Sequence, residues 1–192
     1  AEGACGPHGY HMYVSTDVDG TYQALDRYQR RQHGCNWMTA QYFETMKKAS
    51  DDPGINFSLH TIELYDGPIA PQGSSAAAAR PRLVAGEVGF TIGGIYTSMS
   101  GFYEVAGTGT VQLVLLGRWL EQRGYAFWSL GHCYSPQMEY KRQLGHRIYP
   151  RGDFLRRLRE ERGSFVLPQA PSARSFAGLE NGAECDLPSL LR

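Results

Sequence analysis

The hydrophobic pattern of this 192-residue chain switches repeatedly between helical and strand period, and this order of patterns limits the fold more than any other feature. In chain order, we expect a strand at 9–15, helices at 21–32 and 40–49, strands at 57–65 and within 82–96, a helix at 111–122, a strand at 125–130, a helix at 138–144, a strand at 146–149 and a helix at 153–162. The pattern as a whole predicts an α/β fold, in which helices flank a mixed, largely antiparallel central sheet.

A single domain with extended arms accounts for the length and composition. We place an N-terminal arm at 1–9, the folded domain at 10–162 and a C-terminal tail at 163–192, with a flexible insertion rich in proline and alanine at 66–81. No apolar run approaches the roughly 18 residues of a membrane helix, so we expect no membrane span. The formal net charge of zero argues against a surface that is basic throughout.

The cysteines and the start of the chain give little further information. The four cysteines form no Cys-x-x-Cys pair, so no standard zinc module and no metal site is expected. The chain begins at Ala1 without an initiator methionine, which we interpret either as removal of a targeting peptide or as trimming. The compartment, cytoplasm or organelle interior, therefore stays open at this point.

A glycine-rich turn precedes the strongest helical pattern of the chain. Free backbone N–H groups at the start of a helix can hold an anion, and the candidates here are Gly107, Thr108, Gly109 and Thr110. A tight connection from strand to helix explains the same residues without a ligand. The order of elements around this turn is similar to that of the GNAT superfamily of N-acetyltransferases, which implies a single acyltransferase-like (GNAT-like) domain.

Several short blocks between residues 36 and 158 resemble the leucyl/phenylalanyl-tRNA–protein transferases. The blocks are Asn36-Trp37-Met38, Gly86-Glu87-Val88-Gly89, Ile95-Tyr96-Thr97-Ser98-Met99-Ser100-Gly101-Phe102, Gly109-Thr110-Val111-Gln112-Leu113, Leu144-Gly145 and Pro150-Arg151 ahead of Phe154-Leu155. The resemblance implies transfer of leucine or phenylalanine from aminoacyl-tRNA to the N-terminus of a protein that begins with a basic residue. Such a reaction needs no cofactor, because the aminoacyl ester is already activated.

Two groups of residues would bind the substrates of that reaction. An apolar pocket for the leucine or phenylalanine side chain has the candidates Trp37, Tyr96, Phe102, Phe127 and Trp128, each of which is equally typical of a protein core. Between residues 141 and 162, eight Lys or Arg face three acids, a local net charge of +5. We expect contact with RNA there, through Lys141, Arg142, Arg147, Arg151, Arg156 and Arg157.

The catalytic positions of the family carry different residue types in this chain. The family's Asp-Cys-Gln strand motif falls on Ser129-Leu130-Gly131, and its conserved glutamate falls on Met99, so we take Ser129, Gly131 and Met99 as the catalytic positions. A serine cannot act as a carboxylate base at neutral pH. Other titratable residues are alternative candidates, although no motif places them: Glu87, Glu104, His132 and Glu139.

These departures leave three functions open. The chain is a divergent aminoacyl-tRNA–protein transferase, or it is an inactive descendant that serves as a structural subunit of a large assembly. In the second case the partners would bind through 1–9, 66–81 and 163–192. The third function, an acyl-CoA-dependent N-acetyltransferase, explains the glycine turn but not the blocks at 97–102 and 144–155.

Overall fold

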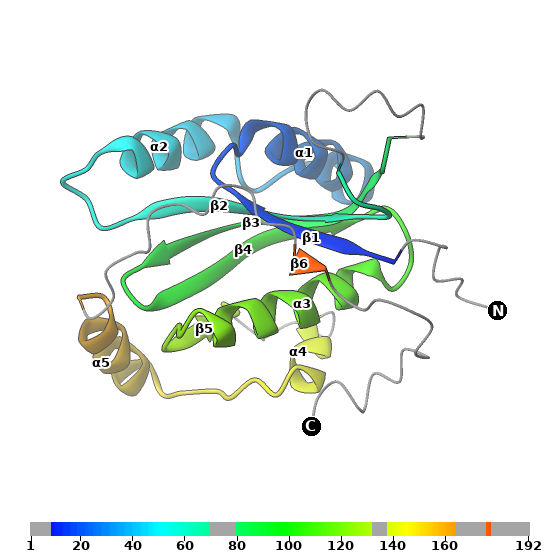
Figure 1. Cartoon of the computed structure of the whole chain (residues 1–192). Helices are drawn as coiled ribbons and strands as arrows, with labels where there is room; N and C mark the ends of the chain where they lie inside the picture. The colour runs from blue at the N-terminus through cyan, green and yellow to red at the C-terminus, as the bar shows by residue number, and fades with distance from the viewer. Residues whose placement is uncertain (1–8, 70–79, 132–137, 164–175, 178–192) are drawn as a thin grey trace.

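A mixed sheet with the strand order β5-β4-β3-β2-β1-β6 forms the centre of the computed structural model (Figure 1). The structure describes residues 9–69, 80–131, 138–163 and 176–177. Its elements are β1 (His11–Ser15), α1 (Asp19–His33), α2 (Ala40–Asp51), β2 (Ser58–Tyr65), β3 (Leu83–Ile92), β4 (Ile95–Tyr103), α3 (Thr108–Gln122), β5 (Phe127–Ser129), α4 (Tyr140–Gln143), α5 (Arg151–Glu161) and the two-residue β6 (Phe176–Ala177). The predicted α/β class with a mixed, largely antiparallel sheet is confirmed.

The pairing of the strands changes direction once. Strands β1 to β4 and the short β6 pair antiparallel, whereas β4 and β5 pair parallel. The parallel pair is joined by α3, because a chain that returns to the same end of a sheet needs a crossover connection. The tail residues Phe176–Ala177 pair with His11 and Met12 of β1, so this part of the tail closes the sheet edge opposite β5.

Helices cover both faces of the sheet. Helices α1 and α2 lie on one face and α3 lies on the other (Figure 1). The apolar cluster under α3 includes Met12, Ile62, Leu64, Tyr96, Leu115, Leu116 and Trp119. The cluster under α1 and α2 includes Leu25, Met38, Phe43, Leu59, Val88 and Phe102. Each central strand therefore supplies alternate side chains to two separate cores, as the period of a strand requires.

Helix ends follow the expected chemistry. Thr39 caps α2, because its side chain accepts a hydrogen bond from the Tyr42 N–H. Gly107, with φ of 84°, precedes α3 in the left-handed conformation that glycine adopts readily. The helix begins at Thr108, three residues before the predicted start at 111. No helix in the described part of the chain is both long and apolar enough to span a membrane.

The strand predicted at 146–149 is wrong. These residues have no regular structure, and Ile148 is 75% exposed. The run is confined between Gly145 and Pro150, and the nearby edge strand β5 has only three residues. A run this short cannot form a ladder without an adjacent strand edge to pair with. The predicted arm at 1–9, insertion at 66–81 and tail at 163–192 lie largely outside the described residues.

Candidate functional site

Strands β4 and β5 pair over only part of their length. The parallel ladder joins Ile95 to Phe127, Tyr96 to Trp128 and Thr97 to Ser129, and it ends there. Strand β4 continues to Tyr103, and residues 98–103 pair with no strand other than β3 in the described part of the chain. We call the place where β5 leaves β4 the fork. A sheet edge that opens in this way presents unpaired backbone donors and acceptors.

A β-bulge in β4 lies directly at the fork. On β3, the neighbouring residues Val88 and Gly89 pair with Ser100 and Ser98, so Met99 is the extra residue of β4. Bulges redirect side chains locally and are common beside active sites. Here Met99 packs against the apolar cluster under α1 and α2, whereas Ser98 makes its hydrogen bonds on the α3 side of the sheet.

A buried carboxylate with polar partners lies on the α3 side of the fork. The Ser98 hydroxyl donates to Oε1 of Glu87 at 2.7 Å, and the Tyr96 hydroxyl donates to the same oxygen at 2.8 Å. The Trp128 indole N–H donates to Oγ of Ser98 at 2.9 Å. We call Glu87, Tyr96, Ser98 and Trp128 the carboxyl cluster. Glu87 is 3% exposed, whereas Ser98 is half-buried.

Burial controls the electrostatics of the carboxyl cluster. Desolvation raises the pKa of Glu87 above its usual value of 4.5, and hydrogen bonds from Ser98 and Tyr96 oppose this rise. The Gln112 amide of α3 also lowers that pKa, and its buried Nε2 has no other hydrogen-bond partner among the described residues. Burial raises the pKa of Tyr140 at the start of α4, and the Glu87 charge adds to that effect. A carboxyl with a raised pKa is a better proton acceptor than an exposed one.

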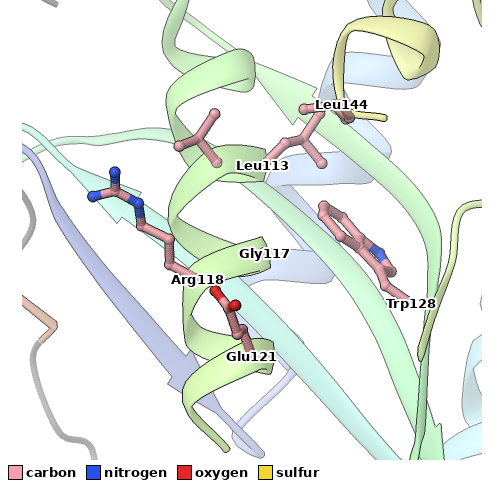
Figure 2. A pocket seen from close by; sticks show the side chains of 7 residues that line it. Leu113, Gly117, Arg118, Glu121, Trp128 and Leu144 are labelled. Atoms are coloured by element: carbon pink, nitrogen blue, oxygen red, sulfur yellow. The ribbon is translucent and has the colours of Figure 1, made fainter. Parts of the chain in front are cut away.

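A cleft of about 170 Å³ lies beside the carboxyl cluster. Its lining comes from α3, β5 and the end of α4, and consists of Leu113, Val114, Gly117, Arg118, Glu121, Trp128 and Leu144. Figure 2 shows Trp128 and Leu144 on one side of α3, with the Arg118 side chain extending to the other. A Cβ at Gly117 would lie 3.3 Å from the Trp128 ring, so glycine keeps this wall of the cleft open. Trp128 therefore contacts both the cleft and Ser98.

The structure does not bring the predicted pocket residues together. Only Tyr96 and Trp128 lie in the carboxyl cluster. Trp37 is 55% exposed and contacts Tyr42 at the start of α2, whereas Phe102 lies in the core under α1 and α2. Phe127 lies on the outside, where its ring contacts Phe154 and the Arg157 guanidinium. The bulge in β4 sends Tyr96 and Phe102 to different faces of the sheet, and Trp37 lies outside the strands; residue type alone predicts neither placement.

The three predicted catalytic residues also do not lie together in one site. Ser129 is the last paired residue of β5, opposite Thr97, and Gly131 follows it with φ of 68°. Met99 faces the apolar core under α1 and α2 rather than the carboxyl cluster. Of the alternative acids, Glu87 lies in the cluster, Glu104 forms an ion pair with Arg31, and Glu139 pairs with Arg142. His132 lies outside the described residues.

Several polar groups of the predicted anion site at the start of α3 already have hydrogen-bond partners within the protein. The Thr108 hydroxyl is buried and donates to the carbonyl oxygens of Val84 and Val105. The Thr108 N–H bonds the Val105 carbonyl, and the Thr110 N–H bonds the Gly107 carbonyl. Gly109 packs against the Tyr103 ring. These contacts are those of a tight connection from strand to helix.

The predicted RNA-binding residues divide into four groups. Lys141 does not belong to a basic surface, because it is 6% exposed and donates to the Leu130 carbonyl at 2.5 Å. Arg142 and Arg156 form ion pairs with Glu139 and Asp153. Arg147 and Arg151 are exposed and form no ion pair within the described residues, while Arg157 stacks on Phe127 and Tyr149.

The carboxyl cluster itself was not predicted as a site. The sequence signal for it is one charged residue, Glu87, at an inward position of a strand of small and apolar residues. A glutamate in that setting is almost never fully buried unless it has partners. The partners Tyr96, Ser98 and Trp128 come from two other strands, so the signal becomes a site only when β3, β4 and β5 are assembled.

No group of His, Cys, Asp and Glu among the described residues has the arrangement of a metal site. The sequence matches no family model and no curated protein sequence.

Proposed function

We propose that this protein is an aminoacyltransferase with a GNAT-like fold, related in activity to the leucyl/phenylalanyl-tRNA–protein transferases. The observation that carries the proposal is the carboxyl cluster at the fork, beside a cleft of about 170 Å³. A parallel β4–β5 pair joined by α3, next to an antiparallel meander, supports an acyltransferase arrangement. The blocks at 86–89 and 95–102, which resemble the transferase family, support the same class of enzyme. These two blocks contain Glu87, Tyr96 and Ser98 of the carboxyl cluster.

The reaction would use the groups at the fork as follows. An amine attacks the ester carbon of an aminoacyl-tRNA, so the enzyme must accept a proton and stabilise the oxyanion that forms. The Glu87 carboxyl group is the proton acceptor. The half-buried Ser98, whose hydroxyl donates to this carboxyl group, lies between it and the fork. Backbone N–H groups on the open edge of β4 are the candidates for oxyanion donors.

The cleft is suited to the side chain of the transferred amino acid. An apolar cavity of about 150 Å³ in another protein accepts benzene, which has the size of a phenylalanine ring. The cleft here is about 170 Å³ and has leucine and tryptophan walls. Glu121, which also lines the cleft, supplies a carboxylate for the ammonium group of the amino acid.

A direct assay tests the proposed function. The purified protein is incubated with leucyl- or phenylalanyl-tRNA labelled in the amino acid and with a peptide that begins with arginine, and transfer to the peptide is measured. We expect transfer to this peptide and none to the same peptide with an acetylated N-terminus, because an amide nitrogen is not nucleophilic. Absence of transfer from both aminoacyl-tRNAs would contradict the proposal.

If the exposed arginines bind RNA phosphates, the affinity for tRNA should depend on salt concentration through them. Replacing Arg147 and Arg151 together with alanine should lower the slope of log affinity against log salt concentration by about 2, because each phosphate contact releases counterions. The matched control replaces Arg142 and Arg156, whose charges are neutralised by Glu139 and Asp153. Titrations of tRNA at several salt concentrations measure both slopes, and equal slopes in the two double variants would be inconsistent with this surface.

A second function, a non-catalytic subunit of a larger assembly, has one specific observation in its favour. The family's glutamate position is Met99, which packs into an apolar core, and its aspartate position is Ser129. The native mass of the protein isolated gently from its source separates the two functions. A subunit would elute only with a large particle and transfer nothing, whereas the enzyme would transfer at its own chain mass.

A further inference from the structure

We propose that Ser98 is an activated nucleophile that takes the acyl group covalently, with Glu87 as its base. The inference rests on the proposed function only for the identity of the acyl donor. Its own basis is the geometry of the carboxyl cluster, in which a half-buried hydroxyl lies in hydrogen-bond contact with a fully buried carboxyl.

The contacts around Ser98 are those of a nucleophile, a base and a positioning group. Its hydroxyl donates to Glu87 Oε1 at 2.7 Å, which is the contact that lets a base remove the hydroxyl proton. The Tyr96 hydroxyl donates to the same carboxyl oxygen at 2.8 Å and holds the carboxyl in place. The Trp128 indole N–H, at 2.9 Å from Oγ, fixes the serine side chain against the wall of the cleft.

A second serine on the same strand shows that this environment is specific. Ser100 lies on the other side of the bulged residue Met99, and its hydroxyl meets the Gln29 amide of α1 at 3.4 Å. Ser100 is buried and has no carboxylate partner among the described residues. The bulge thus places one serine of β4 against a base and the other against a neutral amide.

Ser98 lies directly after the end of the ladder between β4 and β5. The ladder with β5 ends at Thr97, so Ser98 is the first residue of β4 without a partner on that side within the described chain. We assign the backbone N–H groups of this stretch of β4 as the donors to the oxyanion of an acyl intermediate. The cleft beyond Trp128 then receives the side chain of the acyl group.

The covalent step is balanced without any cofactor. Oγ of Ser98 forms a bond to the ester carbon, its proton moves to Glu87, and the bond between that carbon and the ribose oxygen breaks. The ribose oxygen takes the proton from Glu87 as it leaves. In the second half, the amine nitrogen attacks the seryl ester, loses a proton to Glu87, and Oγ leaves and recovers that proton. The net result is transfer of the aminoacyl group from ribose to amine.

A serine-reactive probe tests the inference separately from the proposed function. The full-length protein is treated with an alkyl fluorophosphonate, in which Oγ displaces fluoride from phosphorus and the proton leaves with the fluoride. We expect one adduct in the intact mass, located at Ser98 by peptide mapping. Glu87→Gln should lower the labelling rate by about 100-fold, which is the contribution typical of a general base. Ser100→Ala should label at the wild-type rate.

The outcomes distinguish the two proposals. An adduct at Ser98 in a protein that transfers no amino acid would overturn the proposed transferase function but support the assignment of Ser98 as a nucleophile. Amino acid transfer with no adduct, or with an adduct at Ser129, would overturn the activated serine alone. A folded Glu87→Gln variant that labels at the wild-type rate would also overturn it. Because the wild-type adduct alone locates the nucleophile, the result does not depend on whether a variant folds.

Discussion

Replacing Gly89 with alanine should destabilise the protein by about 3 kcal/mol, at the upper end of the range for an overpacked core. The ring of Tyr96 lies across Gly89, so an added Cβ would lie 2.6 Å from Cζ of Tyr96 and 2.8 Å from the Thr97 carbonyl oxygen. Tyr96 is fully buried and its hydroxyl is held by Glu87, so the ring cannot move away. Unfolding in urea, followed by circular dichroism, measures the loss.

The matched control for this prediction is Gly20→Ala. Gly20 lies in α1, and an added Cβ there would meet no atom within 4 Å. Alanine favours a helix over glycine by up to about 1 kcal/mol, so this variant should be slightly more stable than the wild type. If both variants unfolded at the wild-type urea concentration, the tyrosine ring could not lie against β3 as described.

The second large effect is a loss of stability in mild acid that depends on His60. His60 is buried, its Nε2 lies 3.0 Å from Oγ1 of Thr91, and burial lowers its pKa from 6.5 to about 4. The native protein therefore keeps this ring neutral at pH values where the unfolded chain protonates it. The stability that results is fully present above pH 6.5 and is lost as the pH falls toward 4, by about 3 kcal/mol in total.

The His60→Gln variant isolates this contribution. Glutamine can still bond Thr91 but does not titrate, so the difference in unfolding free energy between wild type and variant should change between pH 6.5 and 4.5. Glu87 acts in the opposite direction, because its raised pKa makes the native state less stable as the pH rises. It is present in both proteins and cancels in the difference. A pH-independent difference between wild type and His60→Gln would refute the assignment.

The elements of the fold could be predicted from the sequence because they depend on local patterns. Helical spacing located α1, α2 and α3, and alternation located β2 and β3, each within a few residues of the observed bounds, whereas β4 continues to Tyr103, seven residues beyond the predicted end at 96. The glycine pair at 93–94 was predicted to break two strands, and it forms the turn between β3 and β4. The failure at 146–149 arose because a four-residue pattern carries no information about whether a neighbouring strand edge exists.

Most of the helices and strands, and the isolated charge of Glu87 within β3, follow from local sequence patterns. Which side chains meet depends on how the strands are assembled. The bulged residue Met99 reverses the alternation of the residues after it in β4, so Phe102 joins the core under α1 and α2, whereas Tyr96 and Ser98, which precede the bulge, face α3. Burial of Lys141 and exposure of Trp37 were decided in the same way. The physical reason is that strand register and crossover connections bring together residues distant in sequence, and residue type alone does not encode them.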